Sequence, residues 1–405
     1  MKNIKLTAIP LRTVHPFPAR MAPSIALEKL PKGKQHIILD PMAGSGTTLV
    51  TARLNGHRAI GFDVDPLAVL MARVWCSSIN VDKTRLYFEQ VVEKSIRTYK
   101  TIRADKAYPP HADHKTKKFI DFWFDTDNRK QLTALAKAIT KVPDSNVKQI
   151  LWCAFSRSII TKVSGVSLAM DVSHSRPHKK YDVAPVRAFD AIKKHFEIII
   201  KNAPFQKENR LPEVEVMLGD ARRLPLRNGS VGTVITSPPY LNAIDYLRGH
   251  KLALVWMGHN VDELKGIRSG SIGTEKVFSN SMKQNWALKI LKKMKLSDAV
   301  PARTRNIILR YIIDMNGVIS EISRVVRRNG RVIFVVGDST LHGIFVKNSL
   351  VLIELSKQHS LKLTSTKKRP LPENRRYLPS PTFSKSGQAL SKRMREEIIL
   401  CFTCV

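Results

Sequence analysis

Cysteine is scarce in this chain, which has four cysteines among its 405 residues, too few for a disulfide framework. Cys401 and Cys404 form a CxxC pair, but a zinc site needs about four ligands and no second pair accompanies this one. We therefore expect the pair to lie in a terminal strand, and we expect no metal site.

Long apolar runs are also missing. No uninterrupted run approaches the length of a membrane span, and residues Met1 to Arg20 lack the apolar core and cleavage site of a secretory signal. These absences predict a cytoplasmic protein without a membrane partner.

Acidic residues are outnumbered, because 33 Asp and Glu residues face 68 Lys and Arg residues and give a formal net charge of +35. An excess this large favours a polyanionic partner, with nucleic acid as the first candidate, while a charged solvated surface is the plain alternative. Hydrophobic residues make up 43% of the chain, enough for a buried core.

Apolar runs of strand length alternate with helical patterns. The expected strands are His36 to Leu39, Arg58 to Phe62, Val214 to Leu218, Val231 to Ile235 and Arg331 to Val336, with late strands at Leu361 to Thr366 and Glu397 to Val405. A long amphipathic helix runs from Met315 through Val326 and is expected to end at Asn329-Gly330. This order predicts an α/β fold with a doubly wound, Rossmann-like and mostly parallel sheet.

Two stretches interrupt the alternation. Residues 81–212 are much longer than a crossover needs and have a helical pattern rich in Lys, Arg and His, which predicts an inserted domain between residues 1–80 and 213–405. Residues 259–305 hold several glycines and then many lysines, which predicts a mobile basic loop or small lobe.

The first motif runs from Asp40 to Thr48 and follows the first strand. Gly44 and Gly46 allow a tight turn and a close approach of the backbone to a ligand, and Thr47 opens the next helix. A dinucleotide fingerprint needs a third glycine where Leu49 stands, and a phosphate loop needs a lysine after Gly46. The Asp40 carboxylate repels phosphate but pairs with an ammonium group, so S-adenosylmethionine fits better than NAD or ATP.

Acidic residues end two further strands. Asp63 is placed to accept hydrogen bonds from both ribose hydroxyls, and Asp220 from an adenine amino group. A solvated residue at a strand end is the plain alternative for either. Three acids at successive strand ends, counting Asp40, favour the ligand site.

The second motif, Thr236 to Tyr240, suits a flat base with an exocyclic amine. Its two prolines fix the backbone, so that the Pro238 carbonyl and the Ser237 side chain can accept hydrogen bonds from that amine. Drawing the nitrogen toward tetrahedral geometry frees its lone pair for in-line attack on a methyl group. Tyr240 offers a face for stacking on a flipped base. A Pro-Pro turn with Tyr240 packed in the core is the alternative.

These motifs resemble those of the amino-methyltransferases of DNA, which methylate cytosine N4 or adenine N6. Asp40 to Thr48 is similar to their cofactor motif, with Met42 in place of Phe, and Thr236 to Tyr240 to their catalytic motif. His15 to Arg20, Gly219 to Arg222 and Arg328 to Arg331 resemble further signatures. The resemblance implies catalytic roles for Ser237, Pro238, Pro239 and Tyr240, and cofactor contacts from Phe17, Pro18, Asp40, Ala43, Gly44, Ser45, Gly46, Thr47, Thr48, Asp63, Asp220 and Ala221.

The resemblance leaves the base and the nucleic acid open. Ser at position 237 is commoner in the cytosine-N4 enzymes, which favours that reaction over adenine N6. Double-stranded DNA is the expected partner, RNA is an alternative substrate, and an inactive nucleic-acid-binding protein is the alternative outside enzymes. A cognate restriction endonuclease is a further implied partner.

The large insertion falls where this family does not usually place target recognition. Its segment Asp171 to Lys180 is dense in donors for phosphates and base edges, and near the end of the chain Glu373 to Pro379 combines charge with an aromatic side chain. The expected nucleic-acid contacts are His174, Arg176, His178, Lys179, Arg375 and Arg376. A metal site at Asp171, His174 and His178 is the weaker reading, because in-line methyl transfer needs no metal.

Overall fold

A computed structural model describes residues 11–18, 20–206, 211–241, 245–273, 285–296, 300–371 and 396–405 of the chain. Arg375 and Arg376, expected to contact nucleic acid, lie outside these ranges.

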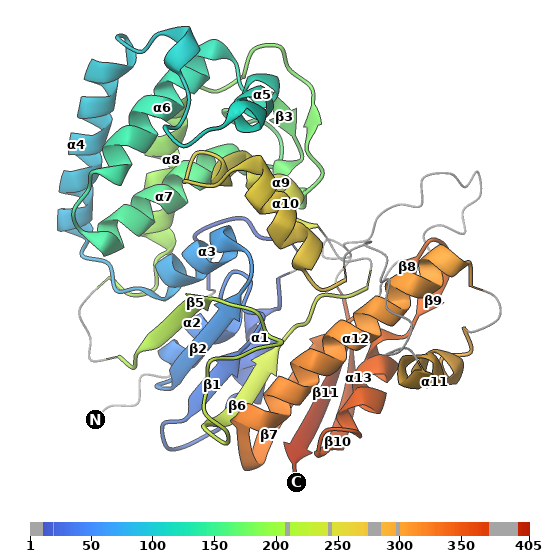
Figure 1. The fold of residues 1–405 in the computed structure, drawn as a ribbon. Coiled ribbons are helices and arrows are strands. Elements are labelled where there is room, and N and C mark those ends of the chain that lie inside the picture. Colours follow the sequence, from blue (N-terminus) through green and yellow to red (C-terminus); the bar gives the residue numbers. More distant parts are fainter. Residues whose placement is uncertain are drawn as a thin grey trace.

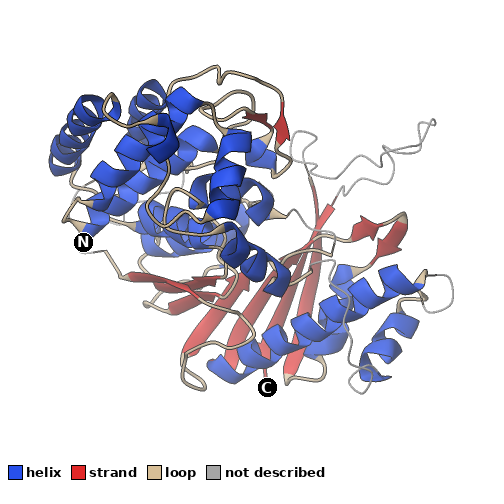
Figure 2. Ribbon diagram, turned by 45° about the horizontal axis from the view of Figure 1, so that its top comes forward, coloured by secondary structure: helices blue, strands red, loops and turns tan. Residues whose placement is uncertain are grey.

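One seven-stranded sheet forms the base of the molecule (Figures 1 and 2). Its order is β10-β11-β7-β6-β1-β2-β5, and the five strands from β7 to β5 are parallel, whereas β11 is antiparallel to both neighbours. The strands are β1 (Ile37–Asp40), β2 (Arg58–Asp63), β5 (Val214–Leu218), β6 (Val231–Thr236), β7 (Val326–Val336), β10 (Leu361–Pro370) and β11 (Glu396–Cys404). The expected Rossmann-like α/β class is confirmed. Cys401 and Cys404 lie in β11, as expected.

Both faces of the sheet are buried, because successive side chains point to opposite sides. Ile38 packs in one core cluster and Leu39 in the other, and Ile333 and Phe334 divide in the same way. The first face is covered by α1 (Pro23–Lys29), α2 (Thr47–Leu54) and α3 (Pro66–Cys76), and the second by α12 (Ala302–Val325) and α13 (Asn348–Ser356).

The amphipathic helix α12 ends earlier than its pattern predicted. Val326 already has extended backbone angles and begins β7, so Asn329 and Gly330 lie within the strand segment and do not stop the helix. Asn329 has a φ of 60°, a left-handed conformation that interrupts the strand before its buried part begins at Val332. Apolar spacing alone placed the end wrongly, because valine suits a strand as well as a helix.

Residues 81–202 form a mainly helical unit above the sheet (Figures 1 and 2). It contains α4 (Val81–Tyr99), η1 (Ala104–Lys106), α5 (His114–Trp123), α6 (Thr126–Thr140), α7 (Ser145–Ile159), β3 (Ala169–Met170), η2 (Val172–His174), β4 (His178–Lys179) and α8 (Ala188–Asn202). Short polar residues begin four of these helices. Asn80, Asp113, Asp125 and Asp144 each accept a hydrogen bond from the backbone N–H three residues ahead.

The stretch 259–305, expected to be a mobile basic loop or small lobe, contains two helices in its described parts. They are α10 (Val261–Gly270) and α11 (Asn285–Lys293). Asn260 and Glu263 form a capping box that starts α10. Together with α9 (Tyr246–Leu254), α10 packs on the helical unit, since Leu252, Val255 and Leu264 share a core with α7.

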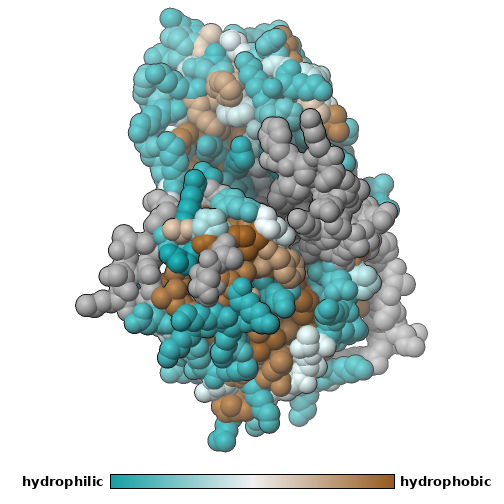
Figure 3. Space-filling model, turned by 90° about the vertical axis from the view of Figure 1, so that its right-hand side faces the viewer, coloured by the Kyte–Doolittle hydropathy of each residue, from teal (hydrophilic) through white to brown (hydrophobic). Residues whose placement is uncertain are grey.

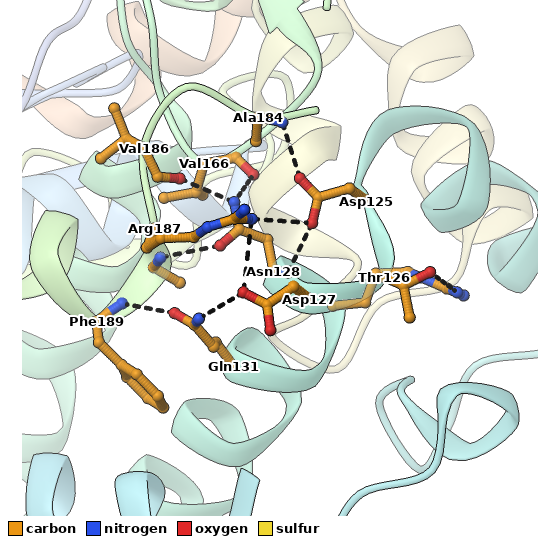
Figure 4. A network of polar contacts seen from close by, with 12 residues as sticks. Asp125, Thr126, Asp127, Asn128, Gln131, Val166, Ala184, Val186, Arg187 and Phe189 are labelled. Atoms are coloured by element: carbon orange, nitrogen blue, oxygen red, sulfur yellow. Dashed lines mark hydrogen bonds and ion pairs between the residues drawn. The ribbon is translucent and has the colours of Figure 1, made fainter. Parts of the chain in front are cut away.

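A polar network fixes the long connection between α7 and α8 (Figure 4). The buried Asn128 side chain donates to the carbonyls of Val166, at 3.0 Å, and Val186, at 2.8 Å, and accepts from the N–H of Ala188. Asp125 accepts from the N–H of Ala184 at 2.8 Å. Both ends of the connection are therefore anchored to α6, which positions the segment between them.

Beyond the sheet, β8 (Ser339–Leu341) and β9 (Ile344–Val346) form a small hairpin.

The face shown in Figure 3 mixes hydrophobic and hydrophilic side chains. None of the helices in the described ranges has the length and apolar character to span a membrane.

Candidate active site

A cavity of about 1420 Å³ opens at the carboxyl ends of the parallel strands. In an open parallel sheet this edge is where ligands bind. Both expected motifs line the cavity, together with parts of the helical unit and of α9 and α10. Segments far apart in the sequence thus meet at one site.

The glycine loop after β1 is held by close packing. Gly44 has a φ of 51°, and a Cβ at this position would lie 3.0 Å from the ring of Phe17. Gly46 has a φ of 89°, and a Cβ there would lie 2.8 Å from the Cβ of Ala72 in α3. Gly46 thus serves the approach of loop and helix, whereas Gly44 lines the cavity beside Phe17. Pro18 is buried next to this wall.

Asp63 at the end of β2 faces the same loop. Its Oδ2 accepts from the N–H of Gly44 at 2.8 Å, and its Oδ1 from the N–H of Asp65 at 2.9 Å. Burial and the charge of Asp65 raise the pKa of Asp63 to about 7. The carboxyl group lines the cavity where a ribose was expected.

Asp40 joins the two motifs. Its Oδ1 accepts a hydrogen bond of 2.7 Å from the hydroxyl of Thr236, the residue before Ser237, and also accepts from the N–H of Met42. Burial raises the pKa of Asp40 to about 6, against the opposing effect of these hydrogen bonds. Thr48 adds a second link between the loops by donating to the carbonyl of Ile235 at 3.3 Å.

The residues around the loop fit S-adenosylmethionine. The buried hydroxyls of Ser45 and Thr47 line the cavity and have no hydrogen-bond partner among the residues that the structure describes. Because Thr47 begins α2, its hydroxyl lies where the helix N-terminus favours a carboxylate. Asp40 and Asp63 supply the negative charge and the acceptors that suit an ammonium group and ribose hydroxyls. A phosphate would meet these two carboxyl groups, which makes a nucleotide a poorer fit.

Asp220 and Ala221 also line the cavity, but Asp220 is already paired. Both of its carboxylate oxygens accept from the Arg222 guanidinium, at 2.7–3.1 Å, and Arg222 also bonds to Asp314 at 2.6 Å. These hydrogen bonds lower the pKa of Asp220 against the effect of burial. An adenine amino group would therefore share an acceptor that Arg222 orients.

The second motif forms the far side of the cavity, where Ser237 to Tyr240 all contribute to the lining. The Ser237 and Tyr240 hydroxyl oxygens are 3.4 Å apart. Burial, and secondarily the charge of Glu397 on β11, raise the pKa of Tyr240, so the phenol is neutral at physiological pH. This neutral ring stands beside a serine hydroxyl, a pair that suits a base with an amine.

Sequence reasoning missed two residues of α9. The ring of Tyr246 stacks on Phe17, with centroids 4.8 Å apart and planes 12° from parallel. His250, 1% exposed, has its Nδ1 2.5 Å from Asp65 Oδ2. The aromatic and histidine residues of Tyr246 to His250 were visible in the sequence, but no motif marked them. Their roles depend on contacts with residues about 185 or more positions earlier.

Only some of the residues expected to contact nucleic acid lie at the cavity. His174, Arg176 and His178 line the cavity, which places this segment opposite the strand ends. The Lys179 ammonium instead lies 5.5 Å from the centre of the Phe122 ring. No group of three metal-ligating side chains occurs within the described ranges, including around Asp171.

The sheet and the cavity at its strand ends have the architecture expected for a methyltransferase. The sequence is similar to those of known methyltransferases. The chain is 22% identical to the type II methyltransferase M.MvaI of Kocuria varians over 412 aligned residues, covering 95% of this chain and 89% of the relative. It is 24% identical to M.BsoBI of Geobacillus stearothermophilus, over 81% of this chain and 67% of that protein. It is 21% identical to M.MjaII of Methanocaldococcus jannaschii, over 89% of this chain and 78% of that protein.

No family model matches the chain. Among solved structures, a geranyl diphosphate methyltransferase aligns over 95% of this chain and 78% of that chain, with a TM-score of 0.33 and 7% identity. All three of these sequence relatives are named type II methyltransferases. They leave the choice between cytosine N4 and adenine N6 open.

Proposed function

We propose that this chain transfers a methyl group from S-adenosylmethionine to the exocyclic amine of a base flipped out of double-stranded DNA, with cytosine N4 as the target. The observation that carries the proposal is the 2.7 Å hydrogen bond between Asp40 and Thr236. It fixes the expected cofactor loop and the expected catalytic loop against each other in one cavity, as a direct transfer between two bound molecules requires.

The chain's own residues would bind the cofactor and the base, orient them toward each other and exclude water. Asp40, Ser45, Thr47 and Asp63 would hold the cofactor, which supplies an electrophilic methyl group. Ser237 and the carbonyl of Pro238 would accept hydrogen bonds from the amine, with Tyr240 against the ring. When bound, S-adenosylmethionine would supply the methyl group, with the N–C bond forming as the C–S bond breaks, while Ser237 and the Pro238 carbonyl would hold the amine as it loses one proton to solvent.

The choice of cytosine rests on Ser237, in line with the sequence resemblance. Adenine N6 is the alternative base, and RNA is the alternative substrate. The inactive-protein alternative is disfavoured, since the cavity is lined by both motifs at once. The proposal also assigns target recognition to the helical unit, and it expects a cytoplasmic enzyme accompanied by a restriction endonuclease.

The test uses the full chain with methyl-labelled S-adenosylmethionine and either unmethylated duplex DNA or structured RNA. After digestion to nucleosides, we expect label in N4-methylcytosine from DNA. Label in N6-methyladenine would overturn the choice of base, and label in RNA alone would overturn the substrate.

Two variants test the catalytic loop. Ser237→Ala removes the hydroxyl acceptor, and we expect at least a tenfold loss of kcat with unchanged cofactor affinity. Ser173→Ala is the matched control, since that serine lies outside the lining of the cavity. Full turnover by both Ser237→Ala and Tyr240→Ala would show that the catalytic assignment is wrong.

A further inference from the structure

Many of the charges that line the cavity gather by sign, although Arg222 lies beside Asp220 and Asp245 lies beside Arg268. The carboxyl groups of Asp40, Asp63, Asp65 and Asp220 gather at the strand ends. Facing them is a set of cations from the helical side that we call the basic wall: Arg176, Arg248, Lys251, Lys265 and Arg268. One half of the cavity therefore suits a cationic ligand and the other half a polyanion.

The basic wall has a regular geometry. Arg248 and Lys251 are three residues apart on α9, and Lys265 and Arg268 are three apart on α10, so each pair shares one helix face. Both pairs line the cavity. In Figure 1, α9 and α10 lie between the helical unit and the sheet, and in the chain they follow β6 and Ser237, the residue after that strand.

Arg176 is joined to these helices by close packing. The Ser175 hydroxyl donates to the carbonyl of Tyr246 at 3.0 Å. Gly249 of α9 lies so close to the same segment that a Cβ would be 2.5 Å from the carbonyl oxygen of Val172. The connection between α7 and α8, which carries Arg176, and helix α9 thus form one continuous surface.

The charges of the wall are only partly compensated. Arg268 Nε lies 2.6 Å from Asp245, and Lys265 lies 3.3 Å from Asp262, which is also 2.6 Å from Lys115. Side chains of Lys265 and Arg268 are nevertheless 61% and 59% exposed. Burial first, and then the charges of Arg268 and Lys265, lower the pKa of Lys251.

We propose that the basic wall is the phosphate-binding surface of this protein and holds the backbone of duplex DNA on either side of the flipped base. The inference rests on the proposed function, because a base can reach Ser237 only if its flanking phosphates lie at the mouth of the same cavity. The charged groups of lysine and arginine side chains at such positions neutralise the phosphates of DNA and release the counterions bound to it. This surface positions the duplex and does not by itself read sequence.

The experiment measures duplex affinity against salt concentration for three proteins. The wild type is compared with Arg248→Gln/Lys251→Gln/Lys265→Gln and with Lys94→Gln/Lys100→Gln/Lys137→Gln. This control removes equal charge from exposed positions outside the cavity, on α4, at its C-cap and on α6. Arg268 is kept because it pairs with Asp245.

We expect the slope of log K against log salt to fall by about 0.9 for each lost phosphate contact, so by roughly 2 to 3 in the first triple variant. At ~0.1 M salt this corresponds to roughly a 10²-fold loss of affinity. The control should keep the wild-type slope, and cofactor affinity should be equal in all three proteins.

An unchanged slope in the first triple variant overturns the proposal. Tighter wild-type binding to structured RNA than to duplex DNA, at equal salt, overturns the choice of partner. Because Lys251 lies 4.6 Å from the centre of the Phe119 ring, Arg248→Gln/Lys265→Gln is measured as well, with an expected fall in slope of about 1.8. If the slopes change as expected but no methyl group enters DNA, the proposed function fails and the phosphate surface stands.

Discussion

Among single residues, Thr236 has the largest consequence for the site. It is fully buried, and its hydroxyl donates to the almost fully buried carboxyl group of Asp40. A buried acceptor that loses its donor bears a desolvation cost, so this side chain is needed for the fold and for the alignment of the two loops.

Thr236→Val keeps the shape of the side chain and removes its hydroxyl. We expect the free energy of unfolding to drop by about 1–3 kcal/mol and kcat to fall, because Asp40 loses a partner and Ser237 loses its anchor. Urea denaturation and methylation rates measure the two effects. Thr236→Ser should restore most of both, and a serine variant as impaired as the valine variant would contradict the role of the hydroxyl.

In the proposed function, Asp63 should make cofactor binding depend on pH. Only the carboxylate can accept from both ribose hydroxyls, and the pKa of Asp63 is about 7 in the free protein. Cofactor affinity should therefore fall as pH decreases below about 7, approaching tenfold per pH unit. Titration calorimetry between pH 8 and 5.5 measures it. Asp63→Asn should lack the step near 7 and keep a weaker one near 6 from Asp40, and a flat wild-type profile would contradict the assignment.

The pH dependence that Asp63 gives to stability has the opposite sign to the pH dependence of cofactor affinity. The folded-state pKa of Asp63 is raised from 3.8, so the folded protein binds more protons than the unfolded chain between about pH 4 and 7. The contribution of this group to the free energy of unfolding therefore decreases as pH rises through that window.

Among the elements, α3 is fixed at its start by a residue with two tasks. Asp65 caps the helix by accepting from the N–H of Leu67 at 2.9 Å, and it also pairs with the buried His250. Helix α3 then packs both on the glycine loop through Ala72 and on α7 of the helical unit. A change at this cap affects the cofactor side and the helical side together.

Asp65→Ala should destabilise the fold by about 3–5 kcal/mol, since it removes the cap and leaves His250 buried without its partner. Asp113→Ala is the control, because the Asp113 side chain also caps its helix, α5, but at an exposed position, and its loss should cost about 1 kcal/mol. Denaturant midpoints measure both. Equal losses in the two variants would show that the contact with His250 adds nothing.

On the scale of the whole molecule, the helical unit and the sheet share one hydrophobic core. The cluster contains Ile38 and Val50 beside the sheet, Trp75 of α3, and Leu151 and Phe196 of the helical unit. A shared core couples the unfolding of its parts, even though the sequence of one interrupts the other.

We expect a single unfolding transition, with coincident curves from circular dichroism and tryptophan fluorescence. Cofactor at about 100 times its Kd should stabilise the whole transition by about 2.7 kcal/mol. Expressed alone, residues 81–202 should not fold cooperatively. Two separate transitions, only one of them shifted by cofactor, would contradict the shared core.

How far the sequence predicts this molecule depends on the range of each interaction. The strand ends at Asp40 and Asp63 and the start of α3 at Asp65-Pro66 follow from local apolar runs and capping residues. Glycines and lysines mask the weak helical patterns of α10 and α11, so the sequence predicted only a mobile basic loop or small lobe in this stretch. The predicted end of α12 was wrong because Val326 pairs with Val231 of β6, and this strand pairing overrides the helical spacing.

By itself, the sequence determined the alternation of strands and helices, the two motifs and the excess of positive charge, since these are encoded by neighbouring residues. Only the tertiary structure decided that Thr236 bonds to Asp40, that Arg222 orients Asp220, and that α9 and α10 bring a basic wall to the cavity. The physical reason is that such contacts join residues distant in the chain, whose approach depends on how buried surfaces pack and not on local pattern.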